Sequence, residues 1–454
     1  MSEQISRRTF FQGTAAGLAA TILARNVFGA NDKLCHAAIG SGGMGGGDLG
    51  AIKGHPKAQI VALCDVDANT LKAAAAKYVG ARTYADWREM LDKEGDQIDS
   101  VNVSTPDHTH APATMTALRK KKHVYCQKPL THDVYESRQI AAAAKAAGVT
   151  TQLGTQAASG IGDRMAVAFL RQGVIGKAKR AILCSNRPGA IEHYRLKGPR
   201  PPQGETPPPH LSWDLWLGTA PERPYAGGGI YHPVRWRAWQ DFGTGWSGDI
   251  GCHIFDAVWK GLRLTAPKTV TAEVQKSWLE SPERRADTWP QGDHITWVFP
   301  ASEATEGDLT LEWFDGEFYP PDDVQKLAGF EAGKPGYPPE SAMVIGTEGA
   351  LLLQHGAGPQ LFPKEKFAKI ERPKLPGRDH YHHFVDACLG GEPTESHFMQ
   401  VGPMAEAILL GTVAIRVPNT LLEWDAANLK VTNSDEAQRL LRRTYRKGWE
   451  VEGL

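Results

Sequence analysis

A carboxylate, an imidazole and a second carboxylate occur at helical spacing near the middle of the chain. Beyond Ser247 the apolar positions suit a helix, so Asp249 and His253, four residues apart, are predicted to project from one face. Asp256, three residues further on, extends the same stripe. An imidazole that titrates near neutrality and is oriented by a partner can transfer a proton. By residue type alone, a capping aspartate and a hydrogen-bonded interior histidine are the commoner explanation.

A lysine followed by a proline comes directly after the predicted strand 123–126. Proline disfavours helical geometry at the residue before it, so Lys128 is predicted to be extended or in a turn. Its ammonium group would then be held at a strand end, in the same layer as a glycine-rich turn. A lysine in this position favours a catalytic role, whereas an ordinary surface lysine is the alternative.

The glycine-rich turn lies between the apolar run 34–39, which indicates a buried parallel strand, and residues 48–53, which can continue as a helix. In a dinucleotide-binding turn the first glycine allows the bend, the second admits a pyrophosphate and the third lets helix and strand pack closely. The phosphates then lie on the helix N-terminus. We therefore expect a dinucleotide to be bound by Gly40, Gly42, Gly43, Met44 and Gly45.

An acidic residue ends the next apolar run, 59–64, and lies 20 residues after Gly45. A carboxylate at this spacing is suited to the hydroxyls of an adenosine ribose, so Asp65 favours a nucleotide site over a flexible glycine loop. No arginine is directly beside Asp65, which favours NAD over NADP.

Further strand ends are predicted to meet at the same edge, because ligands of open α/β sheets gather at the carboxyl ends of the strands. The strand 98–104 leads into a loop that we expect to face the nicotinamide half of the cofactor. Two histidines in this loop could be metal ligands, but no third ligand lies nearby, so hydrogen bonding within a cofactor loop is the favoured interpretation and no metal is expected. The expected cofactor-binding residues at these ends are Thr105, Pro106, His108, His110, Lys128 and Gln156.

The elements that must position these side chains alternate between strand and helix from 34 to 153, which is typical of a doubly wound parallel sheet. We expect an α/β protein with a NAD-binding Rossmann domain at 31–154. A second, substrate-binding α/β domain is expected at 155–454, because the chain becomes rich in strands from Thr269 onward.

The glycine turn, Asp65, Thr105-Pro106 and Lys128-Pro129, in this order, resemble the Gfo/Idh/MocA family of nicotinamide-dependent sugar oxidoreductases. The resemblance covers about residues 34–449. The family usually has Glu-Lys-Pro where this chain has Gln127 before the lysine, so a carboxylate beside the lysine is missing here.

That resemblance implies a catalytic set of Lys128, Asp249 and His253, because family members carry an aspartate and a histidine four residues apart on such a helix. The resemblance therefore favours a catalytic role for Asp249 and His253, whereas residue type alone favours a capping aspartate and a hydrogen-bonded interior histidine. It also implies that the second domain contains a largely antiparallel open sheet, which in the family often packs against a partner subunit and so suggests a homo-oligomer.

Aromatic and basic residues around the stripe suit a carbohydrate substrate. Tryptophans can stack on sugar rings and arginines can donate hydrogen bonds, although packing at a domain interface explains a tryptophan equally well. One or two of the clustered histidines at 380–383 are expected to reach the substrate cleft. Adjacent residues point in different directions around a helix, which argues against a metal there. The expected substrate-binding residues are Arg235, Trp236, Arg237, Trp239, Trp246 and His382.

Charge and cysteine content narrow the class of partner. Lys plus Arg and Asp plus Glu both total 51, so no bulk charge attracts nucleic acid or anionic lipid, and a small molecule is the expected partner. The six cysteines are scattered without a C-x-x-C pair, which predicts free thiols and no zinc site.

Residues 1–30 have the outline of a twin-arginine export leader, with Arg7-Arg8 followed by aromatics and a weakly hydrophobic stretch at 13–24. The stretch is too short to span a bilayer stably, so we expect an exported, periplasmic protein without a membrane span. An uncleaved leader acting as an anchor, and a cytoplasmic arm with a chance arginine pair, are the alternatives.

Three functions fit these residues. The first is a NAD-dependent oxidoreductase that transfers a hydride from a ring carbinol of a carbohydrate. The second is a glycoside-cleaving enzyme that oxidises the ring transiently, eliminates the anomeric substituent and then reduces the ketone again. The third is a non-catalytic sugar-binding protein. Free NAD is expected to be scarce outside the cytoplasm, so we predict a tightly bound cofactor that is regenerated within each catalytic cycle.

Overall fold

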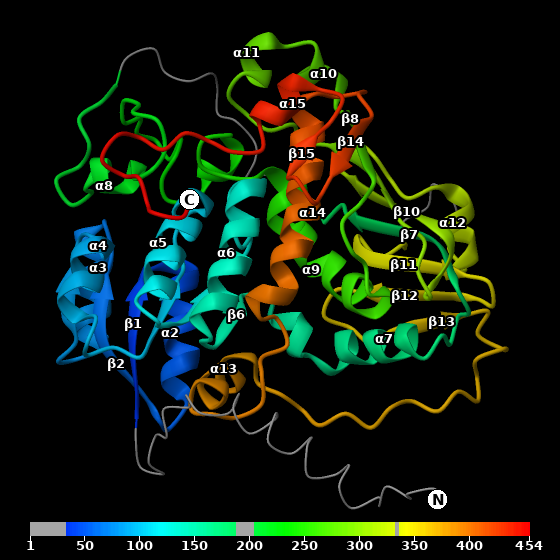
Figure 1. Cartoon of the computed structure of the whole chain (residues 1–454), viewed down its shortest axis with the longest axis horizontal. Helices are drawn as coiled ribbons and strands as arrows, with labels where there is room; N and C mark the ends of the chain where they lie inside the picture. The colour runs from blue at the N-terminus through cyan, green and yellow to red at the C-terminus, as the bar shows by residue number, and fades with distance from the viewer. Residues whose placement is uncertain (1–32, 188–203, 332–335) are drawn as a thin grey trace, which may run out of the picture.

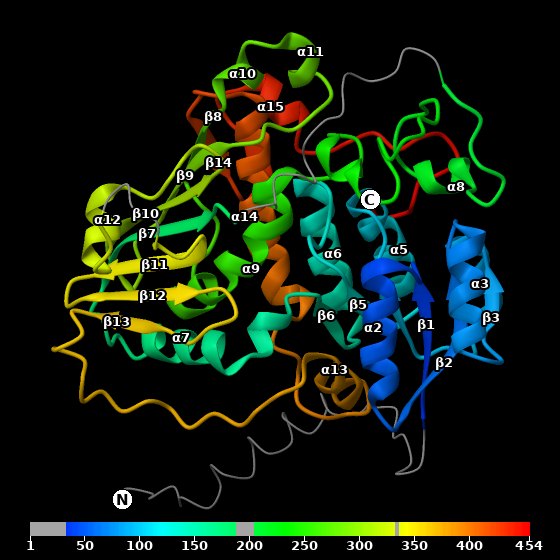
Figure 2. The same ribbon diagram turned by 180° about the vertical axis from the view of Figure 1, so that it is seen from behind.

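The structure is a computed structural model that describes residues 33–187, 204–331 and 336–454. The predicted leader, 1–30, lies outside the described residues. Two sheets stand side by side, with long helices between them (Figures 1 and 2).

The first sheet has six strands in the order β3-β2-β1-β4-β5-β6, and all of its neighbouring strands are parallel. This order, with β1 and β4 adjacent at the centre, is that of a Rossmann sheet. Apart from the exposed edge strand β3, its strands are mainly buried, as is usual in parallel sheets with helices on both faces. The strands are β1 (Leu34–Ile39), β2 (Ala58–Cys64), β3 (Arg82–Tyr84), β4 (Ser100–Val103), β5 (His123–Cys126) and β6 (Thr151–Leu153).

Capping side chains fix where the helices of this domain begin. Asp67 accepts the N–H groups of Asn69 and Thr70, and Asp86 accepts that of Arg88. Asp133 and Glu136 form a reciprocal capping box, and Gly148 ends the same helix in the left-handed conformation. The helices are α2 (Gly43–Gly54), α3 (Ala68–Lys77), α4 (Trp87–Glu94), α5 (Asp107–Arg119) and α6 (Val134–Ala147).

The second sheet has nine strands in the order β13-β12-β11-β7-β10-β9-β8-β14-β15. Only β7 and β10 pair in parallel, and the other recorded pairs are antiparallel. The predicted fold class, a Rossmann sheet followed by an α/β domain with a largely antiparallel sheet, is therefore confirmed. The strands are β7 (Ala178–Ser185), β8 (Thr269–Val274), β9 (Asp293–Phe299), β10 (Thr305–Asp315), β11 (Glu340–Gly346), β12 (Ala350–Gln354), β13 (Gln360–Phe362), β14 (Leu422–Asp425) and β15 (Lys430–Val431).

Both faces of the second sheet are covered. Along β7, Ala181 and Leu183 point into the main core, whereas Ile182 and Cys184 point into a separate cluster that includes Val324. The helices that accompany this sheet and link it to the first domain are α7 (Ile161–Arg171), α8 (Trp213–Leu217), α9 (Gly245–Leu262), α10 (Lys276–Leu279), α11 (Pro282–Arg285), α12 (Asp322–Leu327), α13 (His380–Cys388), α14 (Phe398–Arg416) and α15 (Asp435–Arg439), together with the 3-10 turns η1 (Gln156–Ser159) and η3 (Arg235–Ala238).

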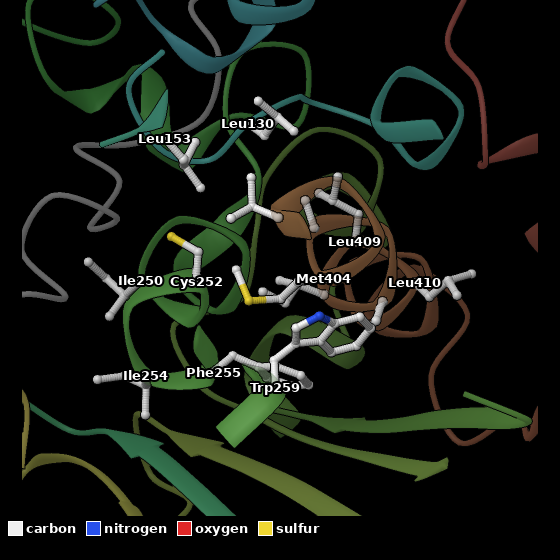
Figure 3. Packing of buried hydrophobic residues seen from close by; sticks show 14 of the residues in the cluster. Leu130, Leu153, Ile250, Cys252, Ile254, Phe255, Trp259, Met404, Leu409 and Leu410 are labelled. Carbon is white, nitrogen blue, oxygen red and sulfur yellow. The ribbon is translucent and has the colours of Figure 1, made fainter. Parts of the chain in front are cut away.

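Helices α9 and α14 lie between the two sheets and join the domains through one hydrophobic core. Figure 3 shows Phe255 and Trp259 of α9 facing Met404 and Leu409 of α14, with Leu130 of the first domain above them. Each large side chain buried in this way contributes about 1.5–3 kcal/mol. Among the described residues only α14 is long and apolar enough to cross a membrane, and 83% of its apolar stretch is buried inside the protein.

A small aromatic lobe, residues 204–244, covers one end of the first domain. Its core packs Trp216, Tyr231, Trp239 and Phe242 around the buried guanidinium of Arg223. Its backbone is tied to the first domain, since the N–H of Ala68 donates to His210 O at 2.8 Å and that of Ser212 donates to Val66 O at 2.9 Å. The lobe therefore lies beside the carboxyl end of β2.

The C-terminal tail returns to the first domain after the second sheet is complete (Figures 1 and 2). Arg443 donates to Glu136 at 2.7 Å and to the carbonyl of His108 at 2.6 Å, and its side chain is 15% exposed. Tyr445 donates to the same carboxylate at 2.6 Å. The tail is therefore anchored at the N-terminal ends of α5 and α6.

Candidate active site

A cavity of about 830 Å³ opens at the carboxyl ends of the first sheet, bounded by the glycine turn, the aromatic lobe and the beginning of α9. Such a volume is in the range of cofactor and substrate sites. It brings together twelve of the residues predicted from the sequence: Gly40, Gly42, Gly43, Met44, Asp65, Thr105, Pro106, Lys128, Trp236, Arg237, Trp246 and Asp249.

The glycine turn has the geometry of a pyrophosphate cradle. Gly40 has φ +86°, and a Cβ there would lie 2.4 Å from Ser104 O. A Cβ on Gly45 would lie 2.3 Å from Gly40 O, so this third glycine is needed for helix and strand to pack. A Cβ on Gly43 would meet open space. The N-cap, Gly42, gives α2 no side-chain cap, which leaves the first N–H groups of the helix available to an anion.

Asp65 is held in a fixed orientation at the cavity wall. Its Oδ2 accepts the N–H of Ser41 at 2.9 Å and the hydroxyl of Ser41 at 3.2 Å, and its Oδ1 accepts the N–H of Asp67 at 3.0 Å. Asp67 and Thr70 line the cavity beside it. The residues present therefore fit a dinucleotide, with the cradle for the pyrophosphate and Asp65 for the adenosine ribose.

An ionic centre of Lys128, Asp249 and Arg237 lies at the other end of the cavity. Lys128 Nζ pairs with Asp249 Oδ1, and Arg237 Nε donates to Asp249 Oδ2 at 3.1 Å. The Asp249 side chain is 3% exposed, against 16% for Lys128 and 26% for Arg237. A buried carboxylate is thus neutralised by two cations that face the cavity, and Arg237 also stacks over Trp236 at 4.2 Å.

A second carboxyl group, Asp107, is buried beside this centre at the start of α5 and accepts the Thr244 hydroxyl at 3.0 Å. Burial and the neighbouring Asp249 charge raise the pKa of Asp107 to about 8, against the opposing influence of Arg237 and Lys128. At neutral pH the group is therefore mainly protonated. The centre holds one carboxylate and one carboxylic acid side by side, as proton-transfer sites often do.

Gln127, the residue before Lys128, takes part in a separate buried network. Gln127 Nε2 donates to both oxygens of Asp48 at 3.0 Å. The same carboxylate accepts the hydroxyls of Ser104 at 2.7 Å and Tyr381 at 2.9 Å. Burial raises the pKa of Asp48 although three hydrogen bonds oppose the rise. Because Asp48 supplies the carboxylate, a glutamate at 127 would face a second negative charge, which accounts for Gln127.

Two residues predicted to bind the cofactor, His108 and His110, make hydrogen bonds within the protein. His110 bridges two loops, since its ring nitrogens lie 2.6 Å from Pro129 O and 2.8 Å from Thr105 O. Burial opposes the charged imidazole, but Cys126 and the two carbonyls raise the pKa of His110 overall. His108 is buried and its Nε2 donates to Trp216 O at 3.0 Å. Neither histidine lines the cavity. They hold in place the loops that carry Thr105 and Lys128.

Four other predicted site residues also lie away from the cavity. Trp239 is 2% exposed in the core of the aromatic lobe, and Gln156 donates to Tyr381 and Tyr125 behind the site. His382 packs against His55 near the far end of α2 from the glycine turn. Arg235, like these three, is absent from the cavity wall. The sequence could not reveal that α13 covers the opposite edge of the sheet or that the lobe buries one of its tryptophans.

His253 lies one turn beyond Asp249 on α9, as predicted, but does not line the cavity. Its ring packs against His355 with centroids 5.0 Å apart, and its Nδ1 has no hydrogen-bond partner among the described residues. Burial, then the nearby Lys128 charge, lower the pKa of His253 well below its usual range. A neutral imidazole therefore lies behind the lysine.

Some cavity residues were not predicted from the sequence. Trp216 and His232 come from the aromatic lobe, Arg187 follows β7, and Asp67 and Ser104 follow strands of the first sheet. Asp67 and Ser104 adjoin predicted strand ends, so the rule that ligands gather at these ends could have included them. Nothing local in the sequence indicated the lobe residues or Arg187, because their positions depend on contacts between distant segments.

Curated relatives match parts of this chain. An inositol 2-dehydrogenase of Rubrobacter xylanophilus is 30% identical over 115 residues, which is 25% of this chain and 32% of that protein. A 1,5-anhydro-D-fructose reductase of Ensifer adhaerens is 30% identical over 184 residues, 40% of this chain and 47% of that protein. A D-apiose dehydrogenase of Paraburkholderia graminis is 34% identical over 113 residues, which is 25% of this chain and 30% of that protein. The chain spans less than half the length of these relatives.

Solved structures share the fold over most of the chain. The WlbA dehydrogenase of Bordetella pertussis, in complex with NADH and UDP-GlcNAcA, superposes with a TM-score of 0.58 at 15% identity, covering 87% of this chain and 99% of that one. GenD2 from gentamicin A biosynthesis, in complex with NAD, superposes with a TM-score of 0.56 at 20% identity, covering 89% of this chain and 100% of that one. The aldose-aldose oxidoreductase of Caulobacter crescentus, complexed with glycerol, gives 0.53 at 17% identity, covering 86% and 100%.

Two family models match in sequence. The NAD-binding Rossmann domain of the oxidoreductase family matches residues 36–155, and the C-terminal α/β domain of the same family matches 169–289. Together with the cradle, the ionic centre and the paired sheets, these matches show that the chain belongs to the Gfo/Idh/MocA family of oxidoreductases and has its NAD-binding domain.

Proposed function

We propose that the protein is a NAD-dependent oxidoreductase that oxidises a ring or chain carbinol of a carbohydrate or polyol. The observation that carries the proposal is the Lys128–Asp249–Arg237 centre in the wall of the cavity that begins at the glycine turn. The named substrates of relatives, inositol, 1,5-anhydro-D-fructose and D-apiose, support a polyhydroxylated substrate.

The cofactor supplies a hydride acceptor when it is bound. In the proposed reaction Lys128 Nζ donates a hydrogen bond to the reacting hydroxyl, and Asp249 fixes the position of that ammonium. Arg237 and the adjacent Trp236 hold the sugar, the first by hydrogen bonds and the second by ring contact. As the hydride leaves, Lys128 gives one of its protons to Asp249 Oδ1, its ion-pair partner, and takes up the hydroxyl proton. Neutral His253, one helical turn beyond Asp249, is proposed to help position this pair.

The test is a panel of inositols, aldoses and aryl glycosides offered to the purified protein, with the absorbance of reduced nicotinamide as readout. Reduction by at least one polyol, lost in Lys128→Ala and kept in the surface control Lys122→Ala, is the expected result. Full activity of Lys128→Ala and of His253→Ala in folded protein contradicts the assignment of the site.

A second candidate is a redox-neutral glycosidase that oxidises, eliminates and reduces within one cycle. The observation that favours it is the aromatic lobe over the cavity, because its residues Trp216, His232 and Val234 share the cavity wall with Asp65 and Asp67. Such a cover suits a retained cofactor. Release of the aglycone without added nucleotide and without net reduction supports the glycosidase, whereas reduction that persists until a ketone or a second sugar is added supports the oxidoreductase.

We further propose that NAD is retained tightly and preferred over NADP. Two histidines of the lobe face Asp67 Oδ2, His232 at 3.5 Å and His210 at 3.9 Å, and so link the lobe to the first domain near Asp65. Exposed pairs of this kind contribute about 0.2–1 kcal/mol each. Wild-type protein should keep its nucleotide through gel filtration, and His232→Ala should release it a few times faster. Protein that binds and releases NAD freely in the wild type contradicts retention.

Export and oligomerisation remain proposals as well. We propose export to the periplasm by the twin-arginine route. The test is to express the full chain with Arg7→Lys and Arg8→Lys, which should stay in the cytoplasm. Wild-type protein found on membranes would indicate an anchor.

We also propose a homo-oligomer through the second domain, supported by the exposed Tyr319 and Leu327 beside its sheet. Tyr319→Glu should reduce the mass measured by light scattering.

A further inference from the structure

A second cavity, of about 500 Å³, lies between α7, α9 and the beginning of α14 and shares no lining residue with the first. The segment between β13 and α13 runs below α7 (Figures 1 and 2). Leu375 of that segment lines the cavity, and Arg164 of α7 donates to Pro376 O at 2.7 Å. The volume is within the range of small-ligand sites and far exceeds one or two water molecules.

Three residues that line the cavity have buried polar atoms without hydrogen-bond partners among the described residues. Asp256 is 1% exposed and uses Oδ2 to bind Lys260 at 2.7 Å, but its Oδ1 has no partner. Both amide atoms of Gln400 and the Nδ1 of His397 are also buried and unpartnered. Each such atom left unsatisfied costs about 1–3 kcal/mol, so this set is suited to an occupant that both donates and accepts hydrogen bonds.

The charge around the cavity is balanced. Burial, together with Asp256, raises the pKa of Asp163 to about 7, and burial lowers the pKa of His397, which keeps its imidazole neutral. Neither an anion nor a metal cation gains from such a wall, and no cluster of metal-ligating side chains occurs among the described residues. The wall contains three acidic and three basic side chains: Asp163, Asp256, Glu395, Arg164, Arg171 and Lys260.

We propose that this second cavity binds a small neutral polyol or monosaccharide, whose hydroxyls bond Asp256 Oδ1, the Gln400 amide and His397 Nδ1. Hydroxyl groups donate and accept at once, so a single neutral molecule can satisfy all four atoms. This site is separate from the proposed catalytic cavity and does not depend on the reaction proposed for it. Asp256, seven residues after Asp249 on α9, thereby acquires a role that catalysis does not give it.

The probe is myo-inositol, titrated against NAD-loaded protein while the thermal midpoint is followed. Sugars stabilise proteins weakly as osmolytes, so the signal is the saturable difference between wild type and Gln400→Leu at each concentration. Gln400→Leu should weaken this component about tenfold, because two hydrogen bonds are lost. Its stability without ligand should be unchanged or higher, since its amide atoms have no protein partner to leave behind.

Met399→Leu is the matched control, because Met399 is 50% exposed one residue earlier on the same helix and should leave the titration unchanged. Val167→Phe, which fills the cavity from α7, should also remove the saturable component. Crystals soaked in myo-inositol should show the molecule against Asp256 and Gln400 in wild type only. Equal titrations of wild type and Gln400→Leu, or water alone in the soaked cavity, would overturn the proposal.

Discussion

Gln127 and Lys128 are neighbours in the chain, and each donates to a different buried carboxylate. Asp249 is paired with two cations, Lys128 and Arg237, whose charged groups reach the cavity. Asp48 is held by three neutral donors, which come from the Gln127, Ser104 and Tyr381 side chains. The first arrangement leaves charged groups that can meet a substrate. The second has its partners fixed and its carboxylate enclosed.

This difference separates chemistry from positioning. The Asp48 network joins α2, the loop after β4 and α13, and it holds the Gln127 side chain against the backbone that carries Lys128, since Lys128 N–H donates to Gln127 Oε1 at 3.3 Å. Removing a donor from Asp48 should therefore reduce stability, whereas removing a cation from Asp249 should reduce the rate of reaction. Four substitutions test this separation.

The largest effect is expected from Lys128→Ala. It removes the group proposed to orient the hydroxyl and pass its proton, so kcat/KM should fall about 10²–10⁴-fold while NAD stays bound. The measurement is steady-state kinetics with the best carbohydrate of the panel, together with the bound nucleotide content. Gln127→Ala, which removes a donor from Asp48, is the matched control. An equal loss of kcat/KM in this variant would contradict the separation between the two carboxylates.

Gln127→Glu should cost about 3 kcal/mol in the free energy of unfolding at neutral pH, because it sets a second carboxylate within 3.0 Å of Asp48 without a cation. The cost should shrink as the pH falls, since one of the two carboxyls then takes up a proton and donates to the other. Urea unfolding at several pH values measures both effects. The double variant with Gln127→Glu and Asp48→Asn exchanges the amide and the carboxylate, so it should recover most of the lost free energy of unfolding. A double variant as unstable as Gln127→Glu alone would contradict the pairing of Gln127 with Asp48.

Asp107→Asn should alter the pH dependence of stability. The folded-state pKa of Asp107 is raised from 3.8 to about 8, so between these values the folded protein binds more protons than the unfolded chain. Stability therefore falls as pH rises through this window, and asparagine removes that fall. Relative to wild type, the variant should gain about 3–4 kcal/mol between pH 5 and pH 8 in chemical unfolding. A constant difference across this range would show that Asp107 ionises as an ordinary carboxylate.

The smallest effect is expected from Tyr381→Phe. It removes one of three donors to Asp48 and leaves no new charge, so it should cost about 1 kcal/mol of stability and leave kcat within about twofold of wild type. Thermal unfolding and the same kinetic assay measure the two quantities. A large loss of rate would place Tyr381 in the catalytic machinery and weaken the separation between the two carboxylates.

Local patterns in the sequence were enough to predict the glycine turn and the strand-end residues Asp65 and Lys128 that line the cavity. The glycine spacing, Asp65 at the end of β2 and Lys128 at the end of β5 depend only on residues close in the chain and on the rule that parallel strands end at one edge. The two sheets could be predicted for the same reason, because the alternation of strands and helices at 34–153 and the many strands after Thr269 are also local patterns.

Contacts between distant segments could not be predicted in this way. Asp48 and Tyr381 are 333 residues apart, and nothing near either residue indicates the other. One or two histidines of 380–383 are predicted to reach the substrate cleft, but His382 packs against His55, which follows α2, and does not line the cavity. Trp239 is predicted to stack on a sugar ring, but the aromatic lobe packs around Arg223 and buries the Trp239 side chain in its core.

The anchoring of Arg443 has a consequence for the order in which the protein folds. Its ion pair with Glu136 joins residues 307 positions apart, so the first domain completes its own surface only after nearly all of the second domain has been made. Contacts of such long range form slowly, because a large loop must close first. On a ribosome, the nucleotide-binding half therefore leaves the carboxylates of Asp133 and Glu136 without their arginine partner until the tail has been made.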